Sequence, residues 1–170
     1  MKYARRLLLL AAALVTLASA LALQAAAGPP NHANRLEATF AETNVSVTNR
    51  IADLGIFQLI NTGTGTVEGF GAATVTVSVT QDRTVQPCGP GSWTNAGTRR
   101  IVLAQGVLVT RALAYVCQTD AGPRVTGTWT VDGASSTGVF AGARGEGEDS
   151  VNIAAGIARL SGSLKLAEGK

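Results

Sequence analysis

The chain has 170 residues, of which 46% are hydrophobic and 15% charged, and its formal net charge is +3 at pH 7. Three basic residues near the start, Lys2, Arg5 and Arg6, account for this whole excess, because Lys and Arg elsewhere equal Asp and Glu in number. The rest of the chain therefore offers no electrostatic basis for binding nucleic acid, and we expect no nucleic-acid partner.

The N-terminus, residues 1–27, has the pattern of a secretory signal peptide. Basic residues precede an apolar run from Leu7 to Leu23, which ends in small residues and Gly28-Pro29-Pro30. A retained transmembrane anchor is the alternative, but no basic stop-transfer flank follows the run. We expect cleavage after Ala27, with Ala20, Ala22 or Ala25 as the alternative positions. We further expect a secreted or extracytoplasmic location and no stable membrane insertion of the mature chain.

Residues 28–35 are expected to form a flexible leader, because the stretch GPPNHANR has two prolines and no apolar run. The only histidine of the chain, His32, lies here, and we interpret it as a solvated residue. The remaining segment, residues 36–168, has the size of one ordinary domain.

Alternation of apolar and polar residues predicts β-strands throughout this domain. In Thr74–Thr80, three valines alternate with threonine and serine, so each such strand would bury one face and expose the other. No segment shows a convincing helical period. The expected strands cover Leu36–Val47, Ala52–Ile60, Thr74–Thr80, Thr98–Gln105, Val107–Thr119, Val125–Val131, Gly145–Ile153 and Ala158–Leu166.

Short strands with closely spaced turns predict an all-β fold, either a sandwich or a barrel. We favour a single eight- or nine-stranded antiparallel β-barrel of calycin-like form, because closure removes exposed strand edges. Glycines inside strands, such as Gly65, Gly127 and Gly162, suit the bends of a small barrel.

The two cysteines, Cys88 and Cys117, predict a disulfide, because an even pair in an exported protein is usually oxidised. In the chain-entropy model such a cross-link contributes about 3–4 kcal/mol. A metal site would need further ligands beside the two cysteines, and a catalytic thiol would need a histidine as its base. The sequence offers neither near these cysteines. We therefore expect no metal and no cofactor.

The stretch Thr137–Gly147 has four glycines and an arginine in 11 residues, which resembles a phosphate-binding loop in composition. A P-loop ends in Gly-Lys-Ser/Thr, whereas Glu146, Glu148 and Asp149 occupy this region and would repel a phosphate. Glu146 and Glu148 alternate with glycines, which is typical of the solvent face of a strand.

A structural role explains these glycines better. Gly138 and Gly142 are expected to supply positive φ or a close backbone approach, and Phe140 to fill the core. Gly145 and Gly147 are expected to lie beneath a bulky side chain of the next strand.

The residues Thr137-Gly138-Val139-Phe140-Ala141-Gly142-Ala143-Arg144-Gly145 resemble the Thr-Gly-x-Phe-x-x-Ala-Arg-Gly stretch of plant dirigent proteins, and are similar to the Gly-Ser-Gly-Ile-Phe-Glu-Gly stretch of allene oxide cyclases. Asn61–Gly71 looks like the glycine-rich hairpin of bacterial secreted proteins of the same superfamily. The resemblance implies an eight-stranded antiparallel barrel with an apolar lumen. Ala134-Ser135-Ser136 replaces the paired glycines usual in dirigent proteins, and the lumenal aspartates of those proteins have no clear match.

Four residues are candidates for binding a ligand in such a lumen. Arg111 and Tyr115 share one strand face, but the opposite face is apolar enough to be the inner one, which would leave Arg111 solvated or paired. Glu42 lies where the alternation of apolar and polar residues shifts by one position, so it marks either a bulge or a polar group in the lumen. Arg144 is the one residue of the family-like motif that could bear function, with a turn role as the alternative.

No catalytic set is apparent in the sequence, so the first expectation is a secreted, non-enzymatic barrel. Such a barrel would bind a small apolar ligand or act as an extracellular interaction module. A cyclase or isomerase that shapes an apolar substrate in the lumen is the alternative, because confinement needs few catalytic residues. A structural envelope protein is a third reading, and the oligomeric state is left open.

Overall fold

A computed structural model of the protein describes residues 35–51 and 54–168. The expected signal peptide, residues 1–27, lies outside the described residues, and so do His32 and all of the expected leader except Arg35.

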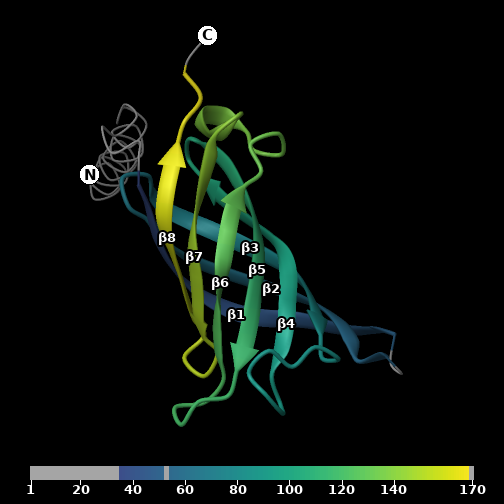
Figure 1. Cartoon of the computed structure of the whole chain (residues 1–170). Coiled ribbons are helices and arrows are strands. Elements are labelled where there is room, and N and C mark those ends of the chain that lie inside the picture. The colour runs from purple at the N-terminus through teal and green to yellow at the C-terminus, as the bar shows by residue number, and fades with distance from the viewer. Residues whose placement is uncertain (1–34, 52–53, 169–170) are drawn as a thin grey trace, which may run out of the picture. The chain divides into compact units, whose positions relative to one another are not determined.

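Eight strands form one closed barrel in which each strand pairs with its neighbours in sequence and β8 pairs with β1 (Figure 1). All pairs are antiparallel, as the sequence predicted. The elements are β1 (Leu36–Ile51), β2 (Ile56–Val67), β3 (Gly71–Asp82), β4 (Trp93–Leu103), β5 (Gly106–Cys117), β6 (Arg124–Val131), the short 3-10 helix η3 (Gly138–Phe140), β7 (Arg144–Asn152) and β8 (Ile157–Lys165).

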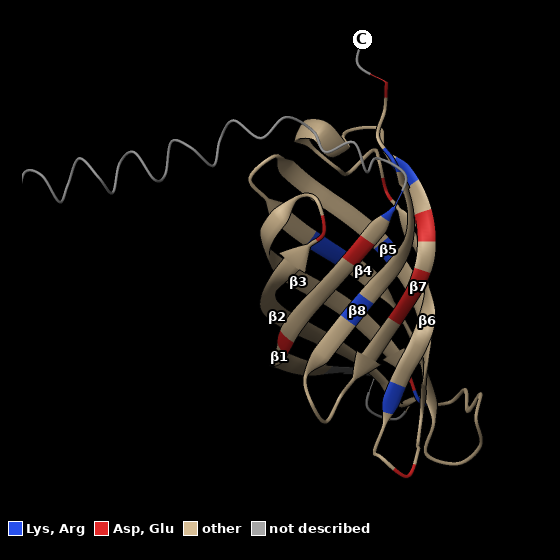
Figure 2. Cartoon of the chain, turned by 90° about the vertical axis from the view of Figure 1, so that its left-hand side faces the viewer, with Lys and Arg blue, Asp and Glu red and all other residues tan. Residues whose placement is uncertain are grey.

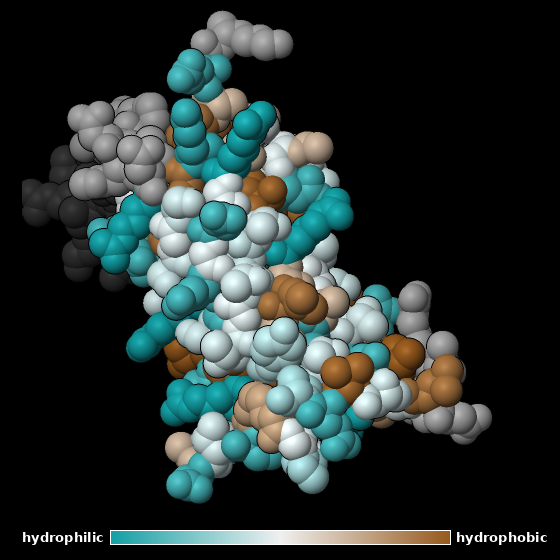
Figure 3. All heavy atoms as spheres, in the orientation of Figure 1, coloured by the Kyte–Doolittle hydropathy of each residue, from teal (hydrophilic) through white to brown (hydrophobic). Residues whose placement is uncertain are grey.

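The alternating sequence pattern gives each strand an inner and an outer face. On β3, Val75 and Val77 are buried while Thr74 and Thr76 are exposed. Fully burying a side chain of this kind contributes roughly 1.5–3 kcal/mol, so the summed inner faces drive closure of the sheet. Exposed hydrophobic residues such as Leu113 are scattered over the outer face (Figure 3).

Most of the core lies in one half of the barrel, the filled half, and a smaller buried cluster of Ala114, Val116 and Val125 lies in the other half. In the filled half, Phe40, Phe140 and Leu164 are completely buried and Trp129 is 1% exposed. The rings of Phe70 and Phe140 lie 5.0 Å apart, measured between centroids. Side chains therefore close the lumen where β1 and β7 begin.

Two strand glycines make room for the largest core residue. A Cβ atom on Gly147 or Gly162 would lie 2.7 or 2.8 Å from Cζ2 of Trp129. The Trp129 indole also donates a hydrogen bond from Nε1 to the Glu148 carbonyl oxygen, at 2.9 Å. Gly147 thus lies beneath a bulky neighbour as expected, but on the preceding strand β6, and the expectation is wrong for Gly145, whose close neighbours are backbone atoms of Ser163 and Leu164.

The glycine-rich stretch before β7 is a structural turn that caps the filled half. Gly138 and Gly142 have φ of 63° and 71°, values that other residues rarely adopt. Phe140, in η3 between them, is completely buried. Both expectations from the sequence are thus confirmed.

Four strands extend further than the sequence indicated, and among them β1 runs to Ile51 and β3 covers Gly71–Asp82. β2 runs on to Val67 because Gly63 and Gly65 let β1 approach: a Cβ on Gly65 would lie 2.8 Å from the Phe40 side chain. β4 begins at Trp93 rather than Thr98.

β1 is divided by a register shift between Asn44 and Ser46 in its pairing with β2. Its first part, Leu36–Ala41, pairs with β8 as well as with β2. The remainder pairs with β2 alone among the described residues, whereas β2 itself pairs with β3 along its whole length. The bulge predicted from the phase shift at Glu42 is present close to this point.

Candidate functional site

The other half of the barrel is open and contains a cavity of about 300 Å³. The β3–β4, β5–β6 and β7–β8 connections lie at this end (Figure 1). Seven of the eight strands supply lining residues, and most of the wall is apolar. The lining residues used below are Glu42, Trp93, Asn95, Arg99, Ala112 and Asp149.

A buried ion cluster forms the floor of this cavity, where it meets the filled half. Arg99 on β4 donates from Nη1 to Oδ2 of Asp149 on β7 at 3.0 Å, and from Nη2 to Oε1 of Glu42 on β1 at 3.2 Å. The side chains of Arg99, Glu42 and Asp149 are only 3%, 5% and 6% exposed. Three strands that are distant in sequence thus meet through one guanidinium group.

The strand geometry explains why these charges point inward. Arg99 shares its face of β4 with the buried Ile101 and Leu103, whereas Arg100 is exposed. Because side chains alternate along a strand, the inner face at this position must carry Arg99. A buried guanidinium charge is tolerated only when it is paired, and the carboxylates of Glu42 and Asp149 pair with Arg99.

Burial raises the pKa of the Glu42 carboxyl above its usual value. The nearby Arg99 charge opposes this effect, while the Asp149 carboxylate adds to it. The Glu42 carboxyl is therefore easier to protonate than an exposed glutamate.

Several polar atoms of the lining are buried without a hydrogen-bond partner among the described residues. They are the acceptors Asp149 Oδ1 and Asn95 Oδ1 and the donors Arg99 Nε and Trp93 Nε1. Buried polar atoms normally have partners, so four such atoms around one cavity mark a place where a polar ligand group can bind.

Of the four residues proposed from the sequence, Glu42 lines the cavity. Arg111 and Tyr115 lie on the outer face of β5, where the Tyr115 side chain is 46% exposed, and Arg144 is exposed at the start of β7. The inner face of β5 is the opposite one, which includes Ala112. The structure thus brings Glu42 to the cavity and leaves the other three outside it.

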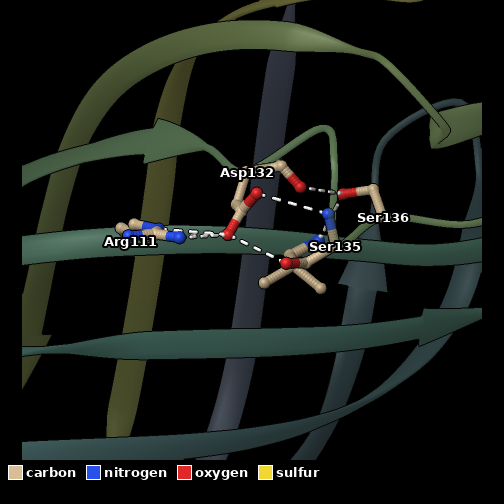
Figure 4. A network of polar contacts seen from close by, with 5 residues as sticks. Arg111, Asp132, Ser135 and Ser136 are labelled. Atoms are coloured by element: carbon tan, nitrogen blue, oxygen red, sulfur yellow. Dashed lines mark hydrogen bonds and ion pairs between the residues drawn. The ribbon is translucent and has the colours of Figure 1, made fainter.

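Arg111 takes part in a polar network on the outside of the barrel (Figure 4). It donates from Nη2 and Nε to Oδ2 of Asp132 at 2.7 and 3.1 Å, and Ser135 donates to the same carboxylate. The hydrogen bond from Arg111 holds the pKa of Asp132 below its usual value. Arg111 is therefore structurally paired, the alternative left open by the sequence.

Arg99 and Asp149 are the site residues that sequence reasoning missed. The signal for Arg99 was its alternation with Ile101 and Leu103. Asp149 was obscured by its acidic neighbours Glu146 and Glu148, which are exposed on β7 (Figure 2).

A disulfide and a cation–π stack support the open end of the barrel. Cys88 in the β3–β4 loop is bonded to Cys117 at the end of β5, as predicted, with their Cα atoms 5.6 Å apart. The Arg83 guanidinium carbon lies 4.5 Å from the centroid of the Phe57 ring and 5.1 Å from that of Trp93. A disulfide is consistent with an oxidising, extracytoplasmic location.

In residues 35–51 and 54–168, no group of His, Cys, Asp and Glu side chains is arranged to hold a metal ion. Within the same part of the chain, no helix is long and apolar enough to span a membrane.

Fold and site together define a closed eight-stranded antiparallel β-barrel with a lumenal cavity above a buried ion cluster. No family model, curated protein or solved structure matches the chain.

Proposed function

We propose that this protein binds a small, largely apolar molecule in the open half of its barrel. The observation that carries the proposal is the cavity of about 300 Å³, whose apolar wall ends in a buried polar floor. Small-molecule sites typically combine an apolar lining with a few well-placed polar groups, and the volume lies at the lower end of their range.

The proposal is tested by filling the cavity from one side. Ala112 lines the cavity, while Leu113, the next residue on β5, is 54% exposed on the outer face. We expect Ala112→Phe to weaken binding of a compact apolar probe such as indole at least tenfold, and Leu113→Phe to leave it unchanged.

Isothermal titration calorimetry on the purified proteins measures both affinities, and circular dichroism checks that both variants fold. Absence of indole binding to the wild-type protein would refute the lumenal site for ligands of this size. Equal binding by wild type and the folded Ala112→Phe variant would place the bound probe elsewhere.

An isomerase or cyclase is the second candidate, favoured by the buried Glu42 carboxyl with its raised pKa. A general acid or base needs a pKa near the working pH and a shielded position beside its substrate. Once a ligand is identified, Glu42→Gln should retain binding but abolish any conversion of that ligand, as followed by mass spectrometry. Unchanged conversion would exclude Glu42 from the chemistry.

We also propose that the chain is exported and related to the allene oxide cyclase and dirigent barrels. The N-terminal signal pattern and the Cys88–Cys117 disulfide support export. The Thr137–Gly145 motif and the eight-stranded barrel support the relationship. N-terminal sequencing of the protein recovered from its native host tests export, with Gly28 as the expected first residue.

A further inference from the structure

The floor of the cavity has one more negative group than positive groups. Arg99 contacts both Glu42 and Asp149, and no other charged side chain lines the cavity among the described residues. With both carboxylates ionised, one guanidinium faces two anions at exposures of 6% or less. A surplus charge in such a place is costly, and either a proton on a carboxyl group or a bound cation relieves it.

Two buried acceptor atoms provide a second, independent observation. Asp149 uses Oδ2 for Arg99, and its Oδ1 has no hydrogen-bond partner among the described residues, nor has Asn95 Oδ1. Both residues line the cavity. A ligand that donates hydrogen bonds would complete them, because a buried acceptor without a donor is unfavourable.

We propose that the lumen selects a compact, mostly apolar amine whose ammonium group donates to Asp149 Oδ1. The inference rests on the proposed function, since it names the ligand class of the same cavity. An ammonium group combines the missing positive charge with three donors and no acceptor.

The two other ligand classes fit the floor less well. A carboxylate would add another anion beside Glu42 and Asp149, and a neutral alcohol would leave the surplus charge in place. The two donors without partners, Trp93 Nε1 and Arg99 Nε, lie six residues apart on β4, and an ammonium group does not satisfy them.

Three probes of similar size separate these classes: 2-phenylethylamine, 2-phenylethanol and 3-phenylpropanoate, titrated calorimetrically into the purified protein near neutral pH. We expect the amine to bind at least tenfold more tightly than the alcohol, and the carboxylate to bind most weakly. If the alcohol or the carboxylate binds as tightly as the amine, the amine inference is overturned while the proposed lumenal function stands. If none of the three binds, both are overturned.

Asp149→Asn removes the surplus anion and retains the Arg99–Glu42 pair. Its matched control, Glu148→Gln, removes a carboxylate from the exposed face of the same strand. We expect the preference for the amine over the alcohol to disappear in Asp149→Asn and to persist in Glu148→Gln. A preference that persists in both variants overturns the inference, and if Asp149→Asn does not fold, the wild-type probe series decides the question alone.

Discussion

Arg99 occupies a position where a strand of this barrel otherwise buries an apolar side chain. Its two carboxylate partners come from β1 and β7, so the cluster joins three parts of the wall across the lumen. The attraction within such a cluster is offset by the cost of removing its charges from water, so we assign it no large net stabilisation. Removing one partner is different, because it leaves the others buried and unpaired.

Arg99→Met should therefore lower the free energy of unfolding by about 3–5 kcal/mol, since it leaves two carboxylates buried without a cation. Arg100→Met, one residue further on the exposed face, should change it by less than about 0.5 kcal/mol. Urea denaturation followed by circular dichroism measures both values. Equal stability of the two variants would show that water or protonation neutralises the cluster at little cost.

Glu42 gives stability a characteristic dependence on pH. Its pKa is raised in the folded state above the usual 4.5, so folding favours the protonated form. This contribution is complete below the usual value and is lost as pH rises through the folded pKa. Asp82 and Asp132 have lowered pKa values, and their contributions are lost only as pH falls below about 3.8.

We expect the free energy of unfolding of Glu42→Gln, relative to wild type, to increase as pH rises above about 4.5. Chemical denaturation of both proteins at a series of pH values from about 4 to 8 measures the difference. A difference that is constant over this range would mean that Glu42 titrates normally. Glu148→Gln, an exposed carboxylate variant, is the control.

At the scale of elements, β1 combines two kinds of environment in one strand. Its first part is hydrogen-bonded on both sides, by β2 and β8, and Leu36 and Phe40 are completely buried. After the register shift at Asn44, the described strand pairs with β2 alone, and Val47 is 59% exposed. Local opening is easiest where few apolar contacts and few neighbouring strands hold the backbone.

Amide hydrogen exchange should consequently be much slower in Leu36–Ala41 than in Ser46–Thr48, by about a hundredfold or more for hydrogen-bonded amides. Exchange followed by NMR spectroscopy resolves the two segments within the same molecule. Similar protection in both would mean that another segment or molecule covers the second half of β1 in solution.

Element positions were largely predictable, because alternation with a period of two is visible wherever one strand face is buried. The end of β2 was not, since Gly63 and Gly65 have no side chain to show the pattern, and Gly97 interrupts the pattern in the same way near the start of β4. Of the site residues, only Glu42 was predicted, because the shift in alternation beside it is visible within one short stretch of sequence. Arg99 and Asp149 come close to Glu42 only through the pairing of strands around the barrel. A local sequence pattern contains no information on that pairing register.

For the molecule as a whole, the disulfide cross-links the open end of the barrel, where the buried core cluster is the smaller one. Cys88 and Cys117 are 29 residues apart in sequence, so their bond restricts the unfolded chain considerably. Replacing both by serine should lower the free energy of unfolding by about 3–4 kcal/mol. Denaturant titration with and without a reducing agent provides the measurement, and the double variant should be insensitive to the reductant. A stability loss well below this range would point to residual structure in the unfolded state.

The division of the barrel into a filled and an open half separates two kinds of evolutionary constraint. Residues around Trp129 and Phe140 are packed on all sides, whereas the apolar lining residues of the cavity face open space on one side. Exchanges among those lining residues can change what the barrel holds with little effect on whether it forms. The architecture therefore allows related chains to diverge in specificity while they keep one scaffold, and a set of lining variants built on this chain could be screened for new ligands.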